Sequence, residues 1–189
     1  MTFSCRRCGT CCTKIGGRFS KKEIELIERG FRNLERRGIR LLIDPKDMSV
    51  PLFPDEIEVM LGLAEEIGID FRPRPKLVKD GEIIEWDLGY SRCPFYDEEK
   101  GCMIYSHRPL ACRAFPVIKI VDHFELLDLC PEAMKFKGRD IEREFPQECI
   151  YAERFFERIE REKRRLLQEG AGAGIRTRAT GLGSQRHNL

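Results

Sequence analysis

The cysteines are the residues of this 189-residue chain that could carry chemistry. Four of the nine fall in the segment Cys5-Arg-Arg-Cys8-Gly-Thr-Cys11-Cys12. Thiolates are soft metal ligands, and two cysteines separated by two residues can face one metal ion. Cys5, Cys8 and Cys11 have the spacing of the first three ligands in a bacterial ferredoxin motif. Because adjacent side chains usually diverge, we expect Cys12 to serve a second site or to pack as apolar surface.

Five more cysteines lie further along the chain, at Cys93, Cys102, Cys112, Cys130 and Cys149. The intervals between the first four are too irregular for a zinc ribbon, which needs two close pairs. Together with the first segment, these four cysteines supply eight thiols. Eight thiols are enough for two four-coordinate sites, or for one metal cluster with the remaining cysteines either reactive or buried in the core. Cys149 stands by itself on a predicted helix face, and we expect it to be a small buried hydrophobe.

The composition favours a globular protein of the cytoplasm. Charged residues make up 35% of the chain, yet the net charge is only +2, so no strong field indicates nucleic acid or an anionic membrane as a partner. No apolar run approaches the ~20 residues that span a bilayer, and the N-terminus lacks a signal-peptide core. In the cytosol, clustered cysteines more often hold metal than form disulfides. The scarcity of Asn and Gln also resembles proteins adapted to high temperature.

Local signals predict three main helices. Ser20 and Glu23 form a capping box, in which each side chain binds a free backbone amide, and apolar residues at helical spacing follow. A second helix is predicted over 54–68, beginning after a proline and ending near a glycine. A third covers about 146–167, with apolar residues on one face and alternating acidic and basic residues on the other, which is typical of a solvated surface.

The strand signals lie between the second and third helices. The Asp80-Gly81 pair favours the positive φ angles of a tight turn and predicts a β-hairpin over 77–86. Residues 117–121 and 124–129 predict two more strands. Prolines and glycines interrupt residues 93–112, where we expect loops and short turns. The predicted fold class is therefore α+β, a small single domain with helices, short hairpins and irregular cysteine-rich loops around a metal site.

We assign residues 1–168 to this metal-binding domain and residues 169–189 to a disordered tail. The tail begins with alternating glycine and alanine, and its remainder shows no apolar periodicity. The stretch Gly174-Ile-Arg-Thr-Arg178 can be encoded by the complement of a transfer-RNA T-arm. We therefore interpret the tail as read-through into a neighbouring gene and assign no function to it.

The cysteine segments together resemble the YkgJ-type cysteine-cluster family of zinc- or iron-chelating domains, named for its C-x-x-C-x-x-C-C motif. The first segment matches this motif. The second block, Cys93-Pro94-Phe95 through Gly101-Cys102 to Arg108-Pro109, Cys112-Arg113 and Phe115-Pro116, matches as well, and the resemblance covers about residues 4–131. It implies metal or iron–sulfur binding by Cys5, Cys8, Cys11, Cys12, Cys93, Cys102, Cys112 and Cys130.

Five side chains other than the cysteines, in the second block or just after it, have types that could act at or near a metal site. Arg108 and Arg113 would place positive charge beside a thiolate site, which would stabilise the thiolates and raise a reduction potential. The alternative is that Arg108 pairs with a carboxylate and fixes the loop. We expect Tyr105 to pack, His107 to lie at the surface or behind the ligands, and His123 to be solvated at a hairpin turn.

Three classes of function remain open at this point. The first is a metal-binding protein, with an iron–sulfur cluster favoured over zinc by the ferredoxin-like triplet, the uneven spacing and the number of thiols. If the metal is zinc, the protein would be an interaction module whose fold the bound zinc stabilises. The second is an enzyme, because the resembled family includes a flagellin lysine methylase, although the sequence shows no cofactor fingerprint and no readable catalytic triad. The third is a nucleic-acid module, which the near-neutral charge disfavours.

Overall fold

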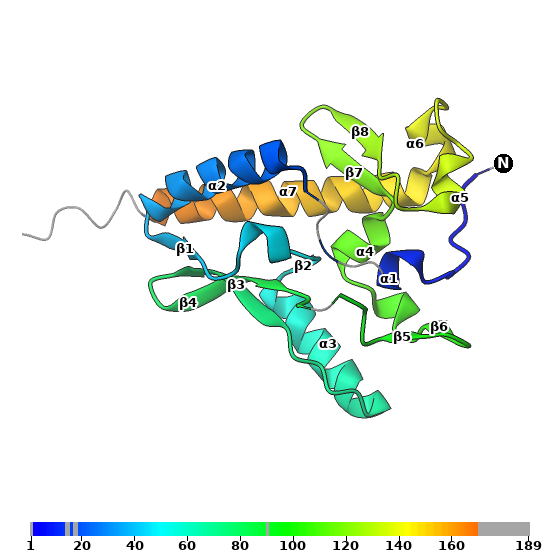
Figure 1. Ribbon diagram of the computed structural model, residues 1–189, viewed down its shortest axis with the longest axis horizontal. Helices are drawn as coiled ribbons and strands as arrows, with labels where there is room; N and C mark the ends of the chain where they lie inside the picture. Colours follow the sequence, from blue (N-terminus) through cyan, green and yellow to red (C-terminus); the bar gives the residue numbers. More distant parts are fainter. Residues whose placement is uncertain (1, 14–15, 17–18, 90, 170–189) are drawn as a thin grey trace, which may run out of the picture.

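The computed structural model describes residues 2–13, 16, 19–89 and 91–169. Four strands form an antiparallel sheet, which Figure 1 shows below the long C-terminal helix. The strand order is β1 (Ile39–Leu41), β3 (Arg74–Lys79), β4 (Glu82–Asp87) and β2 (Pro51–Leu52). β3 and β4 form the predicted hairpin. Its turn residues Asp80 and Gly81 have φ angles of 51° and 88°, as a tight turn of this kind requires.

Two of the predicted helices flank this sheet. α2 (Lys21–Glu35) begins with the predicted capping box, in which the Glu23 backbone amide donates to the Ser20 hydroxyl and the Ser20 amide donates to the Glu23 carboxylate. α3 (Pro54–Ile67) begins at the predicted proline and ends at Gly68, whose φ of 72° suits the left-handed C-terminal cap. A short 3-10 helix, η1 (Pro45–Asp47), connects β1 to β2.

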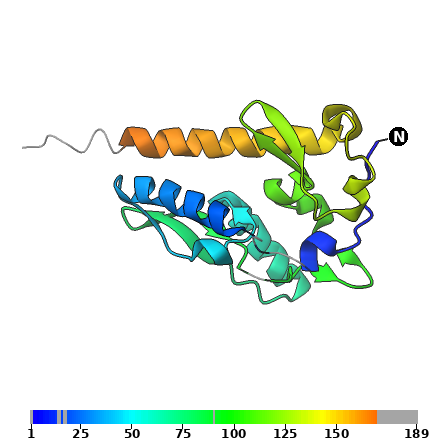
Figure 2. The ribbon, with the colours of Figure 1, turned by 45° about the horizontal axis from the view of Figure 1, so that its top comes forward.

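The third predicted helix, α7 (Pro146–Glu169), runs along one side of the whole molecule (Figures 1 and 2). Its first half packs against α4 (Leu110–Ala114) and β7 (Val117–Ile120), and near its other end Leu166 is buried against Ile39 and Leu77 of the sheet. Lys79 adds a 3.0 Å hydrogen bond from its ammonium to the Leu166 carbonyl oxygen. α7 therefore joins the sheet to the cysteine-bearing half of the chain.

The cysteine-bearing half consists of short elements, as predicted for residues 93–112. They are α1 (Thr10–Thr13), β5 (Tyr96–Asp97), β6 (Gly101–Cys102), the 3-10 helix η2 (Tyr105–His107), α5 (Pro131–Met134) and α6 (Ile141–Glu144). β8 (His123–Leu126) pairs with β7. The turn falls at Val121 and Asp122, so the predicted position of this hairpin is correct but its second strand is shorter than expected.

The core is divided into two main clusters that lie on either side of the cysteines. One packs α3 against β2 and the second cysteine block, with Leu52, Met60, Leu88 and Phe95 almost fully buried. The other packs the start of α7 against α4, β7 and α5 around Phe145, which is also fully buried.

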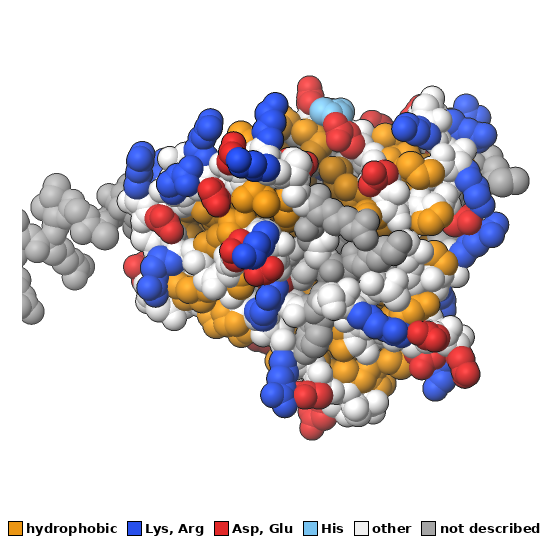
Figure 3. All heavy atoms as spheres, viewed as in Figure 1, with side chains coloured by type: hydrophobic (Ala, Val, Ile, Leu, Met, Phe, Trp, Pro, Cys, Tyr) orange, Lys and Arg blue, Asp and Glu red, His pale blue; other side chains and the backbone are white. Residues whose placement is uncertain are grey.

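The predicted fold class, a small single α+β domain, is confirmed by this arrangement. None of the described helices is long and apolar enough to cross a membrane. Basic and acidic side chains are interspersed over the face shown in Figure 3, in keeping with the small net charge. Residues 170–189 lie outside the described residues, so a disordered tail stays a prediction.

Candidate metal centre

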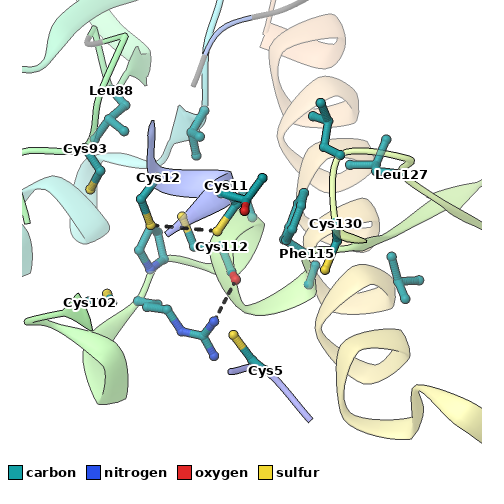
Figure 4. A pocket seen from close by; sticks show the side chains of 18 of the residues that line it. Cys5, Cys11, Cys12, Leu88, Cys93, Cys102, Cys112, Phe115, Leu127 and Cys130 are labelled. Carbon is teal, nitrogen blue, oxygen red and sulfur yellow. Dashed lines mark hydrogen bonds between the residues drawn. The ribbon is translucent and has the colours of Figure 1, made fainter. Parts of the chain in front are cut away.

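Five separate parts of the chain bring eight of the nine cysteines to one cavity of about 540 Å³. The first segment contributes four, the loop after β4 contributes one, and β6, α4 and the residue before α5 contribute one each (Figure 4); they are Cys5, Cys8, Cys11, Cys12, Cys93, Cys102, Cys112 and Cys130. All nine cysteines of the chain are free thiols. Within the described part of the chain, no three His, Cys, Asp or Glu side chains are already gathered closely enough to hold a metal ion.

The first segment turns sharply so that its thiols can face the cavity. Gly9 has a φ of 76°, and its carbonyl oxygen accepts hydrogen bonds from the Cys12 amide at 2.8 Å and from the Thr13 hydroxyl at 3.0 Å. These bonds close the one-turn helix α1, which carries Cys11 and Cys12. A glycine at this position supplies a left-handed conformation that other residues adopt only with strain.

The two cysteine blocks are fastened to each other by backbone and side-chain contacts. The Cys93 amide donates a 2.6 Å hydrogen bond to the Cys12 carbonyl oxygen, and the Tyr96 hydroxyl donates to the Cys8 carbonyl oxygen at 3.4 Å. A Cβ atom on Gly9 would lie only 2.0 Å from the Tyr96 ring, so the glycine also permits this close approach. The relative position of the two blocks is therefore fixed by their own residues.

The expected divergence of Cys11 and Cys12 is wrong. Their Sγ atoms lie 3.7 Å apart, and Cys12 also makes a side-chain hydrogen bond with Cys93. The reason is the tight α1 turn, which sequence spacing does not reveal. Both side chains point toward the middle of the cavity beside Cys112 (Figure 4), so all three thiols share one environment.

The close packing of the thiols raises their pKa values. The hydrogen bond with Cys12, burial and the neighbouring cysteines raise the pKa of Cys11 far above its usual range. The contact with Cys11 lowers the pKa of Cys12, but the hydrogen bond with Cys93 and burial outweigh it and raise that pKa to about 12. Burial, followed by the charges of Cys11 and Cys12, raises the pKa of Cys112. Several adjacent thiolates therefore require a compensating cation, and a bound metal supplies one.

Cys8 differs from these three thiols. It lies at the exposed edge of the cavity, where its Sγ is 3.4 Å from the Thr10 hydroxyl oxygen. Hydrogen bonds from Thr10 lower the pKa of Cys8, because they stabilise the thiolate. Cys8 is thus more readily available in its metal-binding form than Cys11 or Cys12.

Arg108 lines the cavity, whereas Arg113 supports it from behind. The Arg108 guanidinium donates to the carbonyl oxygens of Tyr105 and Cys112 at 3.1 and 3.2 Å. Arg113 donates to the carbonyl oxygens of Arg108 and Ser106, each at 2.6 Å. Both arginines therefore fix the loop between β6 and α4, and Arg108 also brings positive charge to the thiols.

Tyr105 packs as expected, but between two cations. The guanidinium carbons of Arg7 and Arg108 each lie 3.9 Å from the centre of its ring. Such contacts are favourable because the face of an aromatic ring carries partial negative charge. Arg7, which the sequence did not single out, thereby joins the first cysteine segment to the second block and adds a further positive charge at the cavity.

The other singled-out residues lie away from the cavity. Cys149 is buried among Phe145 and Ala152 in the α7 core, as expected of a small hydrophobe. Burial raises its pKa to about 11. His107 is exposed, and His123 is exposed at the β7–β8 hairpin between Asp122 and Glu125.

Asp87 is a buried residue that the sequence did not single out. Its carboxylate accepts hydrogen bonds from the Ser49 amide, the Ser49 hydroxyl, the Arg74 guanidinium and the Gly89 amide at 2.6–2.9 Å. These bonds fix the chain that leaves β4 toward Cys93. An acidic residue at the end of a predicted strand is an ordinary surface feature, so the sequence carries no signal for this role.

The chain was compared with curated proteins, with solved structures and with models of protein families. Neither the curated proteins nor the solved structures include a significant match to this chain. A family model named CxxCxxCC, with the description "Putative zinc- or iron-chelating domain", matches residues 4–132. This range includes the eight cysteines of the cavity and leaves out α7. The chain belongs to the CxxCxxCC family of zinc- or iron-chelating domains.

Proposed function

We propose that the protein binds a metal centre through the eight cysteines of the cavity, and that this centre is an iron–sulfur cluster. One observation carries the proposal. The eight cysteines come from five parts of the chain and line one cavity, whereas the ninth, Cys149, is buried elsewhere. Eight thiols that line one cavity are the arrangement that a thiolate-bound metal centre requires.

The donor set fits a metal of the kind that the family description names. All the candidate ligands are sulfur atoms, which favour zinc, copper(I) and iron–sulfur clusters. The raised pKa values of Cys11 and Cys112 indicate that these neighbouring thiols do not ionise together without a cation.

Three features favour an iron–sulfur cluster over zinc. A single zinc ion uses four ligands, and the cavity offers eight thiols. Cys5, Cys8 and Cys11 have ferredoxin-like spacing. Arg7 and Arg108 lie beside the thiols, and positive charge of this kind offsets the net negative charge of a thiolate-bound cluster. When bound, such a cluster supplies one-electron transfer, while the chain orients it and controls its exposure to water.

Metal, acid-labile sulfide and the visible spectrum of protein purified without oxygen test this proposal together. Iron with matching sulfide and a broad absorption band near ~400 nm, as expected of cysteine-bound clusters, would support it. Colourless protein with stoichiometric zinc would replace the cluster with a zinc-stapled interaction module. Metal-free protein would contradict the proposal as a whole.

A further inference from the structure

The metal-binding cavity has a second, apolar end that the cysteines do not explain. Figure 4 shows Phe115 and Leu127 on the side of the cavity next to α7, with Cys12 and Cys93 across from them. Protein interiors are normally packed as tightly as organic crystals, and voids larger than a water molecule are few. Cys130 lies beside Phe115 on this side (Figure 4), so the apolar residues adjoin the proposed ligands.

Much of the apolar wall comes from outside the family-matched range of residues 4–132. α7 contributes Ala152, Phe155, Phe156 and Ile159 to the cavity lining. The same helix closes the core around α4 and β7, so its apolar residues face the cysteine half of the molecule. The part of the apolar lining that α7 supplies therefore lies outside the matched family range, whereas Phe115 and Leu127 lie within it.

The polar side chains near the apolar end already have partners. The Lys119 ammonium lies 3.1 Å from a Glu153 carboxylate oxygen and 4.4 Å from the centre of the Phe124 ring. A charged ligand would have to disrupt these pairs, whereas an uncharged apolar group would not. An apolar cavity of this kind takes up apolar molecules in preference to ordered water.

We propose that the cavity binds an uncharged hydrophobic small molecule, with an aliphatic or aromatic body, between α7 and the cysteines. The whole cavity, of which the apolar end is one part and the cysteines line the other, has a volume of about 540 Å³, within the range of small-molecule sites. The ligand's body contacts Phe156, Ile159 and Leu127, and its other end reaches the thiols. That it would lie beside a metal centre rests on the function proposed above; the apolar site itself does not.

Fluorescence titration of the metal-loaded protein with N-phenyl-1-naphthylamine, an uncharged apolar probe, tests this site. Ile159→Trp fills the cavity from α7, and Leu127→Trp fills it from the segment after β8. Ile150→Trp is the matched control, because Ile150 is on the same helix, 45% exposed and outside the cavity lining. Circular dichroism and metal content establish that each variant is folded and loaded.

Saturable probe binding, weakened about tenfold or more by each filling variant and unchanged by Ile150→Trp, would support the site, because a bulky indole removes the apolar surface that the probe buries. Absence of saturable binding, or equal affinity in all four proteins, would overturn it. Metal content is measured on the same samples. Bound metal without probe binding contradicts this inference only, whereas site-specific probe binding to metal-free protein contradicts only the proposed function.

Discussion

The backbone amide of Cys93 donates a 2.6 Å hydrogen bond to the carbonyl oxygen of Cys12, two residues that are far apart in the chain. This bond joins the last cysteine of the first motif to the first cysteine of the second block. The contact of Gly9 with the Tyr96 ring and the two cation–π contacts of Tyr105 hold the same two blocks together. The cysteine cavity is thus built by interactions between the motifs.

Replacement of Gly9 by alanine is expected to disrupt this junction. The added Cβ would lie 2.0 Å from the Tyr96 ring, and the φ of 76° disfavours an L-residue. Gly38→Ala is the matched control, since Gly38 has a φ of 78° but no atom within 4 Å of an added Cβ. We expect about 1 kcal/mol of destabilisation in the control and a further ~1–3 kcal/mol in Gly9→Ala, measured by urea unfolding. Equal losses would show that the Tyr96 contact is not tight.

Asp87→Ala is expected to destabilise the protein strongly. Asp87 is fully buried, and its removal leaves the Ser49 amide without its acceptor and takes one of two acceptors each from Arg74 and the Gly89 amide. Loss of one partner from such a buried charged network costs about 3–5 kcal/mol, to be measured by denaturant unfolding. Glu98→Ala serves as the control, because its ion pair with Arg92 is exposed. A loss below about 1 kcal/mol, the usual value of an exposed pair, would contradict the structural role of Asp87.

Glu56 gives the stability a specific pH dependence. Burial raises its pKa, although the amides of Leu110 and Phe53, which donate to it at 2.8 and 3.0 Å, act in the opposite direction. Because the folded-state pKa is raised, this contribution to stability is present below the unfolded pKa of about 4.3 and is lost as pH rises through the folded value. Unfolding midpoints measured across this range should show the decrease in the wild type.

Glu56→Gln should remove that pH-dependent component and add a pH-independent loss of about 1–2 kcal/mol, because one of the two amides loses its acceptor. Glu25→Gln, at an exposed position on α2, should keep the wild-type pH profile. An unchanged pH profile in Glu56→Gln would show that Glu56 is not the titrating group.

Arg108→Gln is expected to weaken metal binding. Arg108 holds the Cys112 carbonyl oxygen and places its charge beside the thiols. Groups that support metal ligands from behind typically change metal affinity by about 10–100-fold when mutated. Competition with a chelator measures this change, and Arg154→Gln, at an exposed site on α7, is the control. Equal chelator sensitivity of the two variants would count against the assignment of Arg108.

The sequence predicted the features that local signals encode. The Ser20–Glu23 capping box, the proline and glycine at the ends of α3 and the Asp80-Gly81 turn each act within a few residues, and all three predictions are confirmed. The cysteine motif was sufficient to indicate the family, because ligand spacing is itself a local property.

Features that depend on distant contacts could not be predicted. β1 and β2 are only two or three residues long and exist because they pair with the β3–β4 hairpin. The convergence of Cys11 and Cys12 depends on the α1 turn, and the role of Asp87 depends on Ser49 and Arg74. The apolar end of the cavity depends on how α7 packs, which its amphipathic pattern does not specify.

The metal content of cysteine variants tests the central claim most directly. Cys8→Ser and Cys102→Ser each remove a thiol from the cavity, whereas Cys149→Ser removes the thiol buried in the α7 core. Metal per protein should be measured on all three and on the wild type, purified without oxygen. We predict that Cys8→Ser and Cys102→Ser lose bound metal and stability together, and that Cys149→Ser keeps the wild-type metal content. Full metal retention in Cys8→Ser and Cys102→Ser would contradict the account.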